Sequence, residues 1–179
     1  LYHILFVAFF LSFNGYAKDC LEVRTGFDIG SGSTKMMVAK VDTCKLKIIE
    51  VLLTENRAVQ YNEDLDKSSD GNLGSTIIEK GSVAFTELIA KANAYKPTTF
   101  FGVATSVFRK AKNGAEVIKN YSLKFKIPMS VITQEEEARL GYLSVLALRD
   151  DVGPNKRNFV VWDIGGGSMQ FFYLRESNI

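Results

Sequence analysis

Two short segments of the sequence are nearly identical and carry residue types that suit phosphate chemistry. They are Asp28-Ile29-Gly30-Ser31-Gly32-Ser33 and Asp163-Ile164-Gly165-Gly166-Gly167-Ser168. Glycines let a tight turn adopt positive φ and present successive backbone N–H groups as a concave anion site, to which the serine hydroxyls add donors. An aspartate beside the anion suits Mg²⁺, which prefers one or two carboxylates, waters and phosphate oxygens. Two such loops facing each other would hold a phosphate chain from both sides.

The same segments also have a simpler interpretation, in which each D-x-G-x-G merely makes a hairpin turn. A single copy would favour that interpretation. Two matching copies, each between apolar strand-like runs, favour the anion site. The segments are not a Walker loop, because no G-K-[ST] follows. They are not a dinucleotide fingerprint either, because a strand rather than a helix follows the turn.

The pattern along the chain predicts alternating strands and helices. We expect strands over residues 22–28, 35–41, 47–53, 99–104, 128–133, 159–163 and 169–174, and helices over 76–94, 113–121 and 135–148. Thr76 and Glu79 are spaced as a capping box, and Asn113 is a second candidate cap. Residues 64–72 and 149–158 are polar and are expected to be a loop and a linker. The order β-β-β-α-β-α-β-α indicates an α/β fold with a mixed sheet.

The composition is that of an ordinary globular protein. Of 179 residues, 46% are hydrophobic and 23% charged, which excludes a disordered tail or a fibre. The formal net charge is only +2, so we expect no nucleic-acid partner. The single histidine, His3, lies in the first seventeen residues, and no Cys/His cluster indicates zinc.

Residues 1–17 resemble a signal peptide. They carry no Lys, Arg, Asp or Glu, they hold an apolar run over residues 4–11, and they end in the small-x-small pattern Gly15-x-Ala17. The run is too short to span a bilayer. We therefore expect an exported, periplasmic protein that meets a membrane only through its export signal. The alternatives are a buried strand or an uncleaved anchor, and without a signal the protein would be cytoplasmic.

The two cysteines, Cys20 and Cys44, agree with export. If residues 22–41 form a hairpin centred near residue 32, the two cysteines face each other near its open end. Facing side chains lie within reach of a disulfide, which a cytosolic protein would rarely use. The alternative is two unrelated thiols, because one bulge would change the register.

Two further segments complete a resemblance to a known family. They are Ala104-Thr105-Ser106-Val107-Phe108-Arg109-Lys110-Ala111-Lys112-Asn113-Gly114 and Val131-Ile132-Thr133-Gln134-Glu135-Glu136-Glu137-Ala138-Arg139-Leu140. With the two glycine loops, they resemble the exopolyphosphatase/guanosine pentaphosphate phosphohydrolase (Ppx/GppA) family of the actin/Hsp70/sugar-kinase superfamily. The resemblance implies an actin-like ATPase (ribonuclease H-like) domain over 18–158, followed by the first hairpin of a truncated second domain over 159–179.

The resemblance also implies a function, the Mg²⁺-dependent release of terminal phosphate from polyphosphate or guanosine pentaphosphate. By similarity, Glu137 is the catalytic base that activates water, and Asp28 and Asp163 hold Mg²⁺. The phosphate-binding residues would be Gly30, Ser31, Gly32, Ser33, Arg109, Gly165, Gly166, Gly167 and Ser168, with Lys35 adding positive charge. Glu135 and Glu136 are better explained as acids at a helix start. The alternative for Arg109 is a solvated surface side chain.

The sequence departs from the family pattern at two positions. Gly32 stands where the first loop usually has Asn, and Gln170 stands where the second usually has Glu. Gln at the second position is typical of ecto-apyrases, so an exported nucleoside tri/diphosphatase is the main alternative. A sensor that binds phosphorylated ligands without hydrolysis is another. A sugar kinase is disfavoured, because nothing marks an adenosine pocket. The expected partner is polyphosphate or a phosphorylated nucleotide, and a homodimer is left open.

Overall fold

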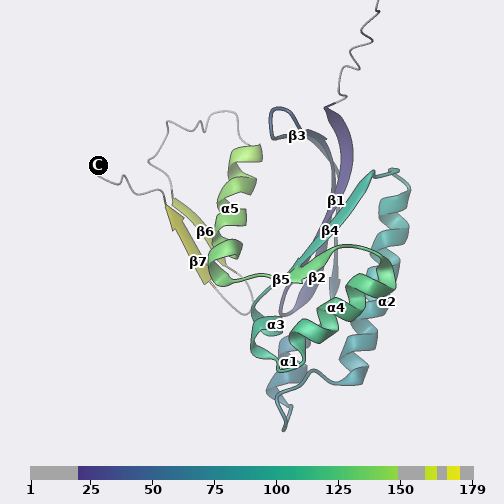
Figure 1. Cartoon of the computed structure of the whole chain (residues 1–179), viewed down its shortest axis with the longest axis vertical. Helices are drawn as coiled ribbons and strands as arrows, with labels where there is room; N and C mark the ends of the chain where they lie inside the picture. Colours follow the sequence, from purple (N-terminus) through teal and green to yellow (C-terminus); the bar gives the residue numbers. More distant parts are fainter. Residues whose placement is uncertain (1–19, 149–159, 165–168, 174–179) are drawn as a thin grey trace, which may run out of the picture.

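The computed structural model describes residues 20–148, 160–164 and 169–173, which form one larger and one smaller sheet (Figure 1). The predicted signal peptide over 1–17, the linker over 149–158 and the second glycine loop from Gly165 to Ser168 lie outside the described residues. None of the helices in the described ranges combines the length and apolar character that a membrane crossing needs.

The larger sheet has five strands in the order β3-β2-β1-β4-β5. Strands β1 (Leu21–Ile29), β2 (Ser33–Asp42) and β3 (Lys47–Ala58) form an antiparallel meander. Strands β4 (Thr99–Ala104) and β5 (Met129–Val131) add parallel to β1 and to each other. Parallel neighbours need long crossovers, and the helices between them provide these. The predicted mixed sheet is therefore confirmed.

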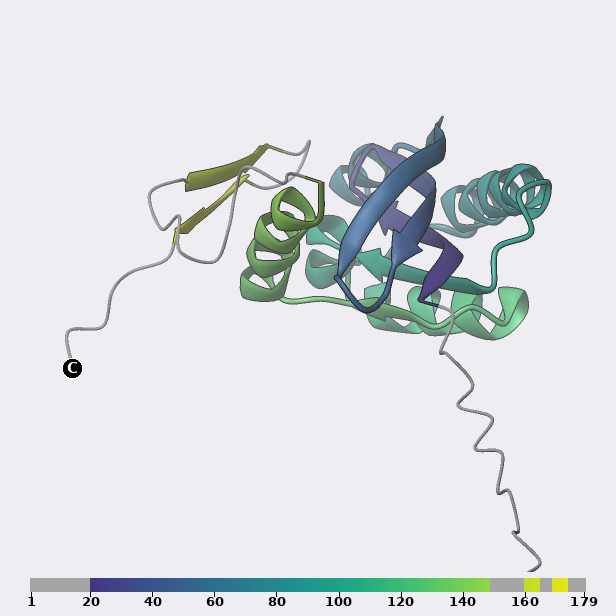
Figure 2. The ribbon, with the colours of Figure 1, turned by 90° about the horizontal axis from the view of Figure 1, so that it is seen from above.

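Five helices accompany this sheet, and three of them match the predictions. They are α1 (Tyr61–Asp66), α2 (Ser75–Asn93), α3 (Ser106–Lys110), α4 (Gly114–Phe125) and α5 (Gln134–Leu148). The core lies where β1 and β2 meet α2 and α4, and the Phe27 and Phe85 rings there are 5.1 Å apart. Helix α5 lies on the opposite side of the sheet from α2 (Figure 2).

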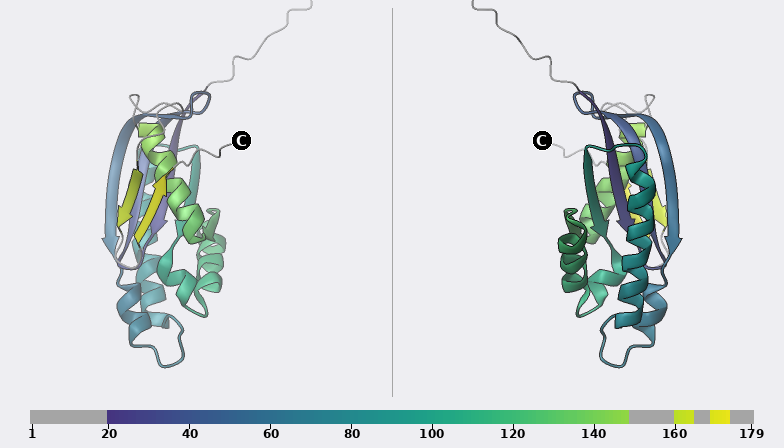
Figure 3. Two further views of the ribbon diagram at one scale, coloured as in Figure 1. Left: turned by 90° about the vertical axis from the view of Figure 1, so that its left-hand side faces the viewer. Right: turned by 90° about the vertical axis from the view of Figure 1, so that its right-hand side faces the viewer.

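Strands β6 (Val160–Ile164) and β7 (Met169–Tyr173) form an antiparallel hairpin. This confirms the two strands predicted around the second glycine turn. The hairpin packs against α5, so that α5 lies between the hairpin and the larger sheet (Figures 2 and 3). Whether residues 159–179 open a second domain stays a prediction.

Several local predictions were wrong in instructive ways. The short helices α1 and α3 were missed, because six or five residues are too few to show a helical period. Strand β3 continues to Ala58 rather than ending at residue 53. Thr76 does not cap α2; Gly74 is the cap residue, and its amide donates to Asp64 Oδ2 at 2.7 Å. Asn113 does occupy the predicted N-cap position of α4, but its side chain makes no capping hydrogen bond.

The Cys20–Cys44 disulfide is present, with a Cα–Cα distance of 5.5 Å. The predicted register was wrong by one residue. Leu21 pairs with Asp42, and the Thr43 amide donates to the Cys20 carbonyl oxygen at 2.7 Å. Thr43 thus stands opposite Cys20, and the disulfide joins diagonal rather than directly facing positions. Such diagonal neighbours remain close enough to bond where the strands are ending.

Candidate functional site

The site predicted from the sequence gathers at the carboxyl ends of β1, β4 and β5. The Thr105 amide donates to the Ile29 carbonyl oxygen at 3.2 Å, and the Ile132 amide donates to the Ala104 carbonyl oxygen at 3.0 Å. These bonds continue the parallel ladder past the strand ends. The first glycine loop, the start of α3 and the start of α5 therefore meet at one edge of the sheet (Figure 1). In an open α/β sheet, ligands bind at this kind of edge.

The first glycine loop turns its carbonyl groups into the protein. The Ser31 carbonyl oxygen accepts from the Asn62 amide at 3.0 Å, and the Gly32 carbonyl oxygen accepts from the Val59 amide at 3.1 Å. The Gly30 amide closes the turn on the Ser33 carbonyl oxygen at 2.9 Å. Among the described residues, none accepts a hydrogen bond from the amides of Ser31 and Gly32. These two N–H groups are thus available to an anion.

The reason for the glycines differs from the predicted one. Neither Gly30 nor Gly32 has a positive φ; among the described glycines only Gly71 does. A Cβ at Gly30 would lie 3.3 Å from the Ser33 carbonyl oxygen, and one at Gly32 would lie 3.2 Å from Gln60 Oε1. At Gly30 the neighbouring atom belongs to the backbone, so a side chain there would strain the turn, whereas at Gly32 it is the tip of the exposed Gln60 side chain, which could move aside.

Asp28 stands at the end of β1 with its side chain 47% exposed, directly opposite Lys35 on β2. The Asp28 carboxylate and the Lys35 ammonium form an ion pair at 3.7 Å. An exposed carboxylate beside the Ser31 and Gly32 amides fits Mg²⁺, which keeps several waters and adds phosphate oxygens. Asp163 is placed only by its backbone, as the β6 residue that pairs with Gln170.

Arg109 and Glu137 are brought together although they lie on different helices. The Arg109 Nη1 atom lies 2.8 Å from Glu137 Oε2 and donates to the Ile132 carbonyl oxygen at 2.9 Å. The two side chains are only 23% and 13% exposed. Arg109 is therefore not the solvated surface side chain of the alternative interpretation. A half-buried guanidinium beside a carboxylate can bind phosphate oxygens and orient a water in the same place.

Glu136 has a structural role at the start of α5. Its amide donates to Thr133 Oγ1 at 3.1 Å, while its Oε2 accepts from the Thr133 amide at 2.8 Å. This reciprocal pair is a capping box. The Thr133 amide holds the pKa of the Glu136 carboxyl below its usual value, because it stabilises the charged form. The prediction that Glu136 belongs to a helix start is confirmed, and the cap fixes the turn that carries Glu137.

The end of the Ala104–Gly114 segment holds the fold rather than the site. The Asn113 side chain accepts from the Leu73 amide and donates to the Leu73 carbonyl oxygen, both at 2.9 Å. The Lys112 ammonium donates to the Asp70 carbonyl oxygen at 2.6 Å. A Cβ at Gly114 would lie 2.1 Å from the Phe108 carbonyl oxygen. These residues lock residues 70–73 onto the junction of α3 and α4.

Sequence reasoning missed the residues that support the first glycine loop from behind. Val59 and Gln60, in the turn between β3 and α1, and Asn62, in the first turn of α1, all approach it. The prediction ended the third strand at residue 53 and left this turn unassigned. Residues 54–57 are all polar, so no apolar alternation in the sequence marks this end of the strand.

The hairpin that carries the second glycine loop lies close to the same place. Gln134, the first residue of α5, extends its Nε2 to 3.4 Å from the Met169 carbonyl oxygen, at the start of β7. The two strand ends that flank residues 165–168 are therefore next to the turn that carries Glu137. Gly165, Gly166, Gly167 and Ser168 themselves lie outside the described residues.

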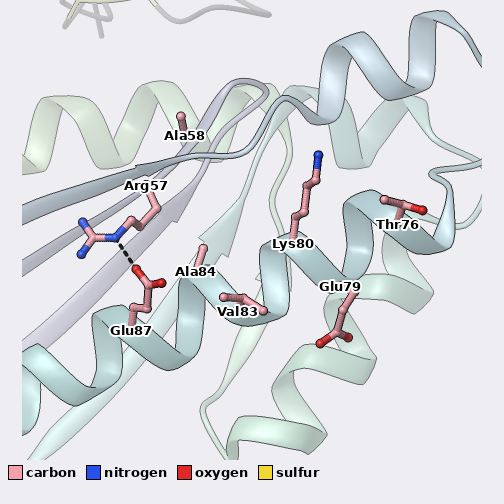
Figure 4. A pocket seen from close by; sticks show the side chains of 8 residues that line it. All are labelled: Arg57, Ala58, Thr76, Glu79, Lys80, Val83, Ala84 and Glu87. Atoms are coloured by element: carbon pink, nitrogen blue, oxygen red, sulfur yellow. Dashed lines mark hydrogen bonds and ion pairs between the residues drawn. The ribbon is translucent and has the colours of Figure 1, made fainter.

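A separate groove of about 590 Å³ lies between β3 and α2. Figure 4 shows its lining side chains, which include Lys80 and Glu79, and the Arg57–Glu87 pair that crosses it. The Arg57 Nε atom is 2.7 Å from Glu87 Oε2. None of the predicted site residues lines this groove, so the candidate site is the sheet edge and not this groove.

The sheet order and the edge site together define an α/β protein of the actin-like ATPase fold. A family model for the Ppx/GppA phosphatase family matches residues 37–179. The chain belongs to that family.

Individual relatives agree with this assignment. An Aquifex aeolicus Ppx/GppA phosphatase of known structure is 25% identical, with a TM-score of 0.71 over 86% of this chain and 48% of its own. An exopolyphosphatase from Cytophaga hutchinsonii shares the fold, with a TM-score of 0.69 over 85% of this chain and 46% of its own at 18% identity. A curated Haemophilus influenzae protein named "Putative exopolyphosphatase" is 26% identical over 143 residues. The matched segment covers 80% of this chain but only 42% of that relative, so this chain spans less than half of the relative's length.

Proposed function

We propose that the protein is a Mg²⁺-dependent phosphoanhydride hydrolase that releases terminal phosphate from polyphosphate or guanosine pentaphosphate. The observation that carries the proposal is the Arg109–Glu137 pair, at 2.8 Å, on the sheet edge that holds the first glycine loop. Membership of the Ppx/GppA phosphatase family supports the reaction class. We also keep the division into residues 18–158 and 159–179 as part of the proposal.

Phosphoryl transfer depends mainly on positioning and on neutralising charge. The amides of Ser31 and Gly32, with the Ser33 hydroxyl, bind the phosphate from one side. Arg109, held by the Ile132 carbonyl oxygen, binds it from another. Glu137 aligns the attacking water with the phosphorus and accepts a proton from that water. Gly165–Ser168 would close the site from the second hairpin. Bound Mg²⁺, held by Asp28 and Asp163, would offset the charge that develops on the phosphate oxygens.

A second function is favoured by one specific feature, Gln170. This residue pairs with Asp163 across the second hairpin, where the family usually has Glu. An amide cannot act as a base, and the same residue type is typical of ecto-apyrases. We therefore keep an exported nucleoside tri/diphosphatase as the alternative. The Cys20–Cys44 disulfide supports an oxidising compartment, in agreement with export.

The decisive experiment compares the wild-type chain with Glu137→Gln. Replacing a general base lowers turnover by a factor of about 10²–10⁴, so we expect a loss of that size in kcat with little change in KM. Glu135→Gln is the matched control, because Glu135 is a neighbouring acid in the first turn of the same helix. Equal phosphate release by the wild type and Glu137→Gln would disprove the assigned base.

Four candidate substrates are ranked by the phosphate that the protein releases from them, with and without Mg²⁺. They are polyphosphate, guanosine pentaphosphate, ATP and ADP. Higher kcat/KM for polyphosphate or the pentaphosphate supports the proposal, and higher values for ATP and ADP support the nucleotidase. Tight calorimetric binding with no phosphate release would instead identify a sensor. Activity retained after complete chelation of divalent cations would exclude the Mg²⁺ requirement.

A further inference from the structure

The turn between β3 and α1 is tied to the first glycine loop by its backbone. Val59 and Asn62 donate their amides to the carbonyl oxygens of Gly32 and Ser31. The turn is also anchored from inside, because Val59 is 3% exposed and Tyr61 is fully buried. Between these two anchors the chain has little freedom to move. The backbone of Gln60 is therefore held beside the loop, and its side chain is exposed.

The Gln60 side chain occupies the space beside Gly32. Its Oε1 atom lies 3.2 Å from the position where a Cβ of residue 32 would stand. Gln60 thus supplies a side-chain amide beside Gly32, a position of the loop that has no side chain of its own. The loop amides of Ser31 and Gly32 lie next to it and have no acceptor among the described residues.

The chemistry of a carboxamide suits this position. Its NH₂ group donates two hydrogen bonds, and the two ends of the amide can exchange by rotation. A phosphate oxygen bound to the loop amides would therefore find a further donor at Gln60. The group is neutral, so it does not compete with Mg²⁺ for the substrate as a lysine or arginine would. A carboxylate in the same place would repel a polyanion and would have no donor.

We propose that Gln60 contacts the phosphate chain bound at the Gly30–Ser33 loop and sets the affinity for it. Gln60 is a binding residue and takes no part in proton transfer. The inference rests on the proposed phosphate site, but it does not need hydrolysis. It is consequently tested first by binding and only then by turnover.

The experiment measures calorimetric binding of tripolyphosphate, in the presence of Mg²⁺, to the full chain and to Gln60→Glu and Gln60→Ala. We expect Gln60→Glu to weaken binding by at least about tenfold, because it loses a charge-assisted donor and adds a like charge. Gln60→Ala loses only the donor and should weaken binding by a smaller factor. Where phosphate release is detectable, KM should rise in parallel while kcat changes little.

Asn93→Asp is the matched control, because it makes the same amide-to-carboxylate change. Asn93 is exposed at the end of α2, beside the start of β4 and at the opposite end of the sheet from the loop. It should bind tripolyphosphate as the wild type does. Circular dichroism and thermal unfolding of both Gln60 variants would identify any loss of fold.

The outcomes separate the two proposals. If the wild type binds tripolyphosphate but hydrolyses no phosphoanhydride, and Gln60→Glu loses the binding, the hydrolase proposal fails and the role of Gln60 stands. If Gln60→Glu binds as tightly as the wild type, the role of Gln60 is disproved whatever the activity. Failure of the wild type to bind tripolyphosphate at all would also overturn it.

Discussion

The two halves of the Ala104–Gly114 segment are adjacent in sequence but have different roles. The first half leads from β4 into α3 and places Arg109 against Glu137 at the sheet edge. The second half turns away from that edge, and Lys112 and Asn113 bind the backbone of residues 70–73. A continuous family motif thus divides into a part that serves the site and a part that serves stability. Resemblance alone does not tell these two parts apart.

The contrast has a simple geometric origin. Helix α3 has only five residues, so the chain makes little more than one turn between the two halves. Gly114 then lets the start of α4 approach the Phe108 backbone closely. Without that approach, Arg109 and Asn113 could not both reach their partners. Substitutions in the two halves should therefore separate loss of activity from loss of stability.

The largest effect is expected for Gly114→Ala. The new Cβ would lie 2.1 Å from the Phe108 carbonyl oxygen, and a backbone group cannot move aside cheaply. We expect a loss of about 3 kcal/mol or more in the free energy of unfolding, measured by urea denaturation. Gly141→Ala is the matched control, because its Cβ would be 3.9 Å from the Val161 side chain and α5 should gain up to about 1 kcal/mol. Similar midpoints for the two variants would contradict the explanation.

The next effect concerns Arg109→Lys. Lysine keeps the positive charge beside Glu137 but loses the planar fork that binds phosphate oxygens in pairs. A hydrogen bond to a charged group contributes about 1.5–3 kcal/mol, so kcat/KM for phosphate release should fall by about 10- to 100-fold. The midpoint of thermal unfolding should stay close to that of the wild type.

A substitution in the second half of the segment should lower stability rather than activity. Asn113→Ala leaves the Leu73 amide without its acceptor and should cost about 1–3 kcal/mol in stability. Its kcat/KM, measured well below the unfolding temperature, should remain near that of the wild type. If Asn113→Ala lowered activity more than Arg109→Lys did, the division of the segment would be wrong.

The smallest effect is expected for the carboxyl of Asp70, in the loop that Lys112 holds, when the pH is lowered. Hydrogen bonds from the Asn72 side chain and amide and from Ser68 lower the pKa of Asp70 to about 2, against an ordinary value of 3.8. Its contribution to stability is therefore complete above pH 3.8 and is lost as the pH falls towards 2. The stability difference between the wild type and Asp70→Asn should shrink in that window. A stability difference that stays constant across this window would contradict the assignment.

Much of the fold could be predicted from the sequence because its signals are local. The alternation of apolar residues in β1, the apolar run in β2 and the helical period of α2 indicated their structure directly. The two glycine loops and the resemblance indicated the family. Capping could not be predicted in the same way. Gly74 and Asn113 are satisfied by residues ten and forty positions away, Asp64 and Leu73, and no local pattern reveals such partners.

The sequence by itself determined the candidate residues: the Asp28–Ser33 loop, Arg109, Glu137 and the Cys20–Cys44 pair. Only the tertiary structure decided which of them meet. Arg109 and Glu137 are 28 positions apart, and they form an ion pair because parallel strands place the starts of α3 and α5 at one edge. The structure alone also showed that Gln60 fills the space beside Gly32. Residue type decides what chemistry a side chain can perform, whereas long-range strand pairing decides where it performs it.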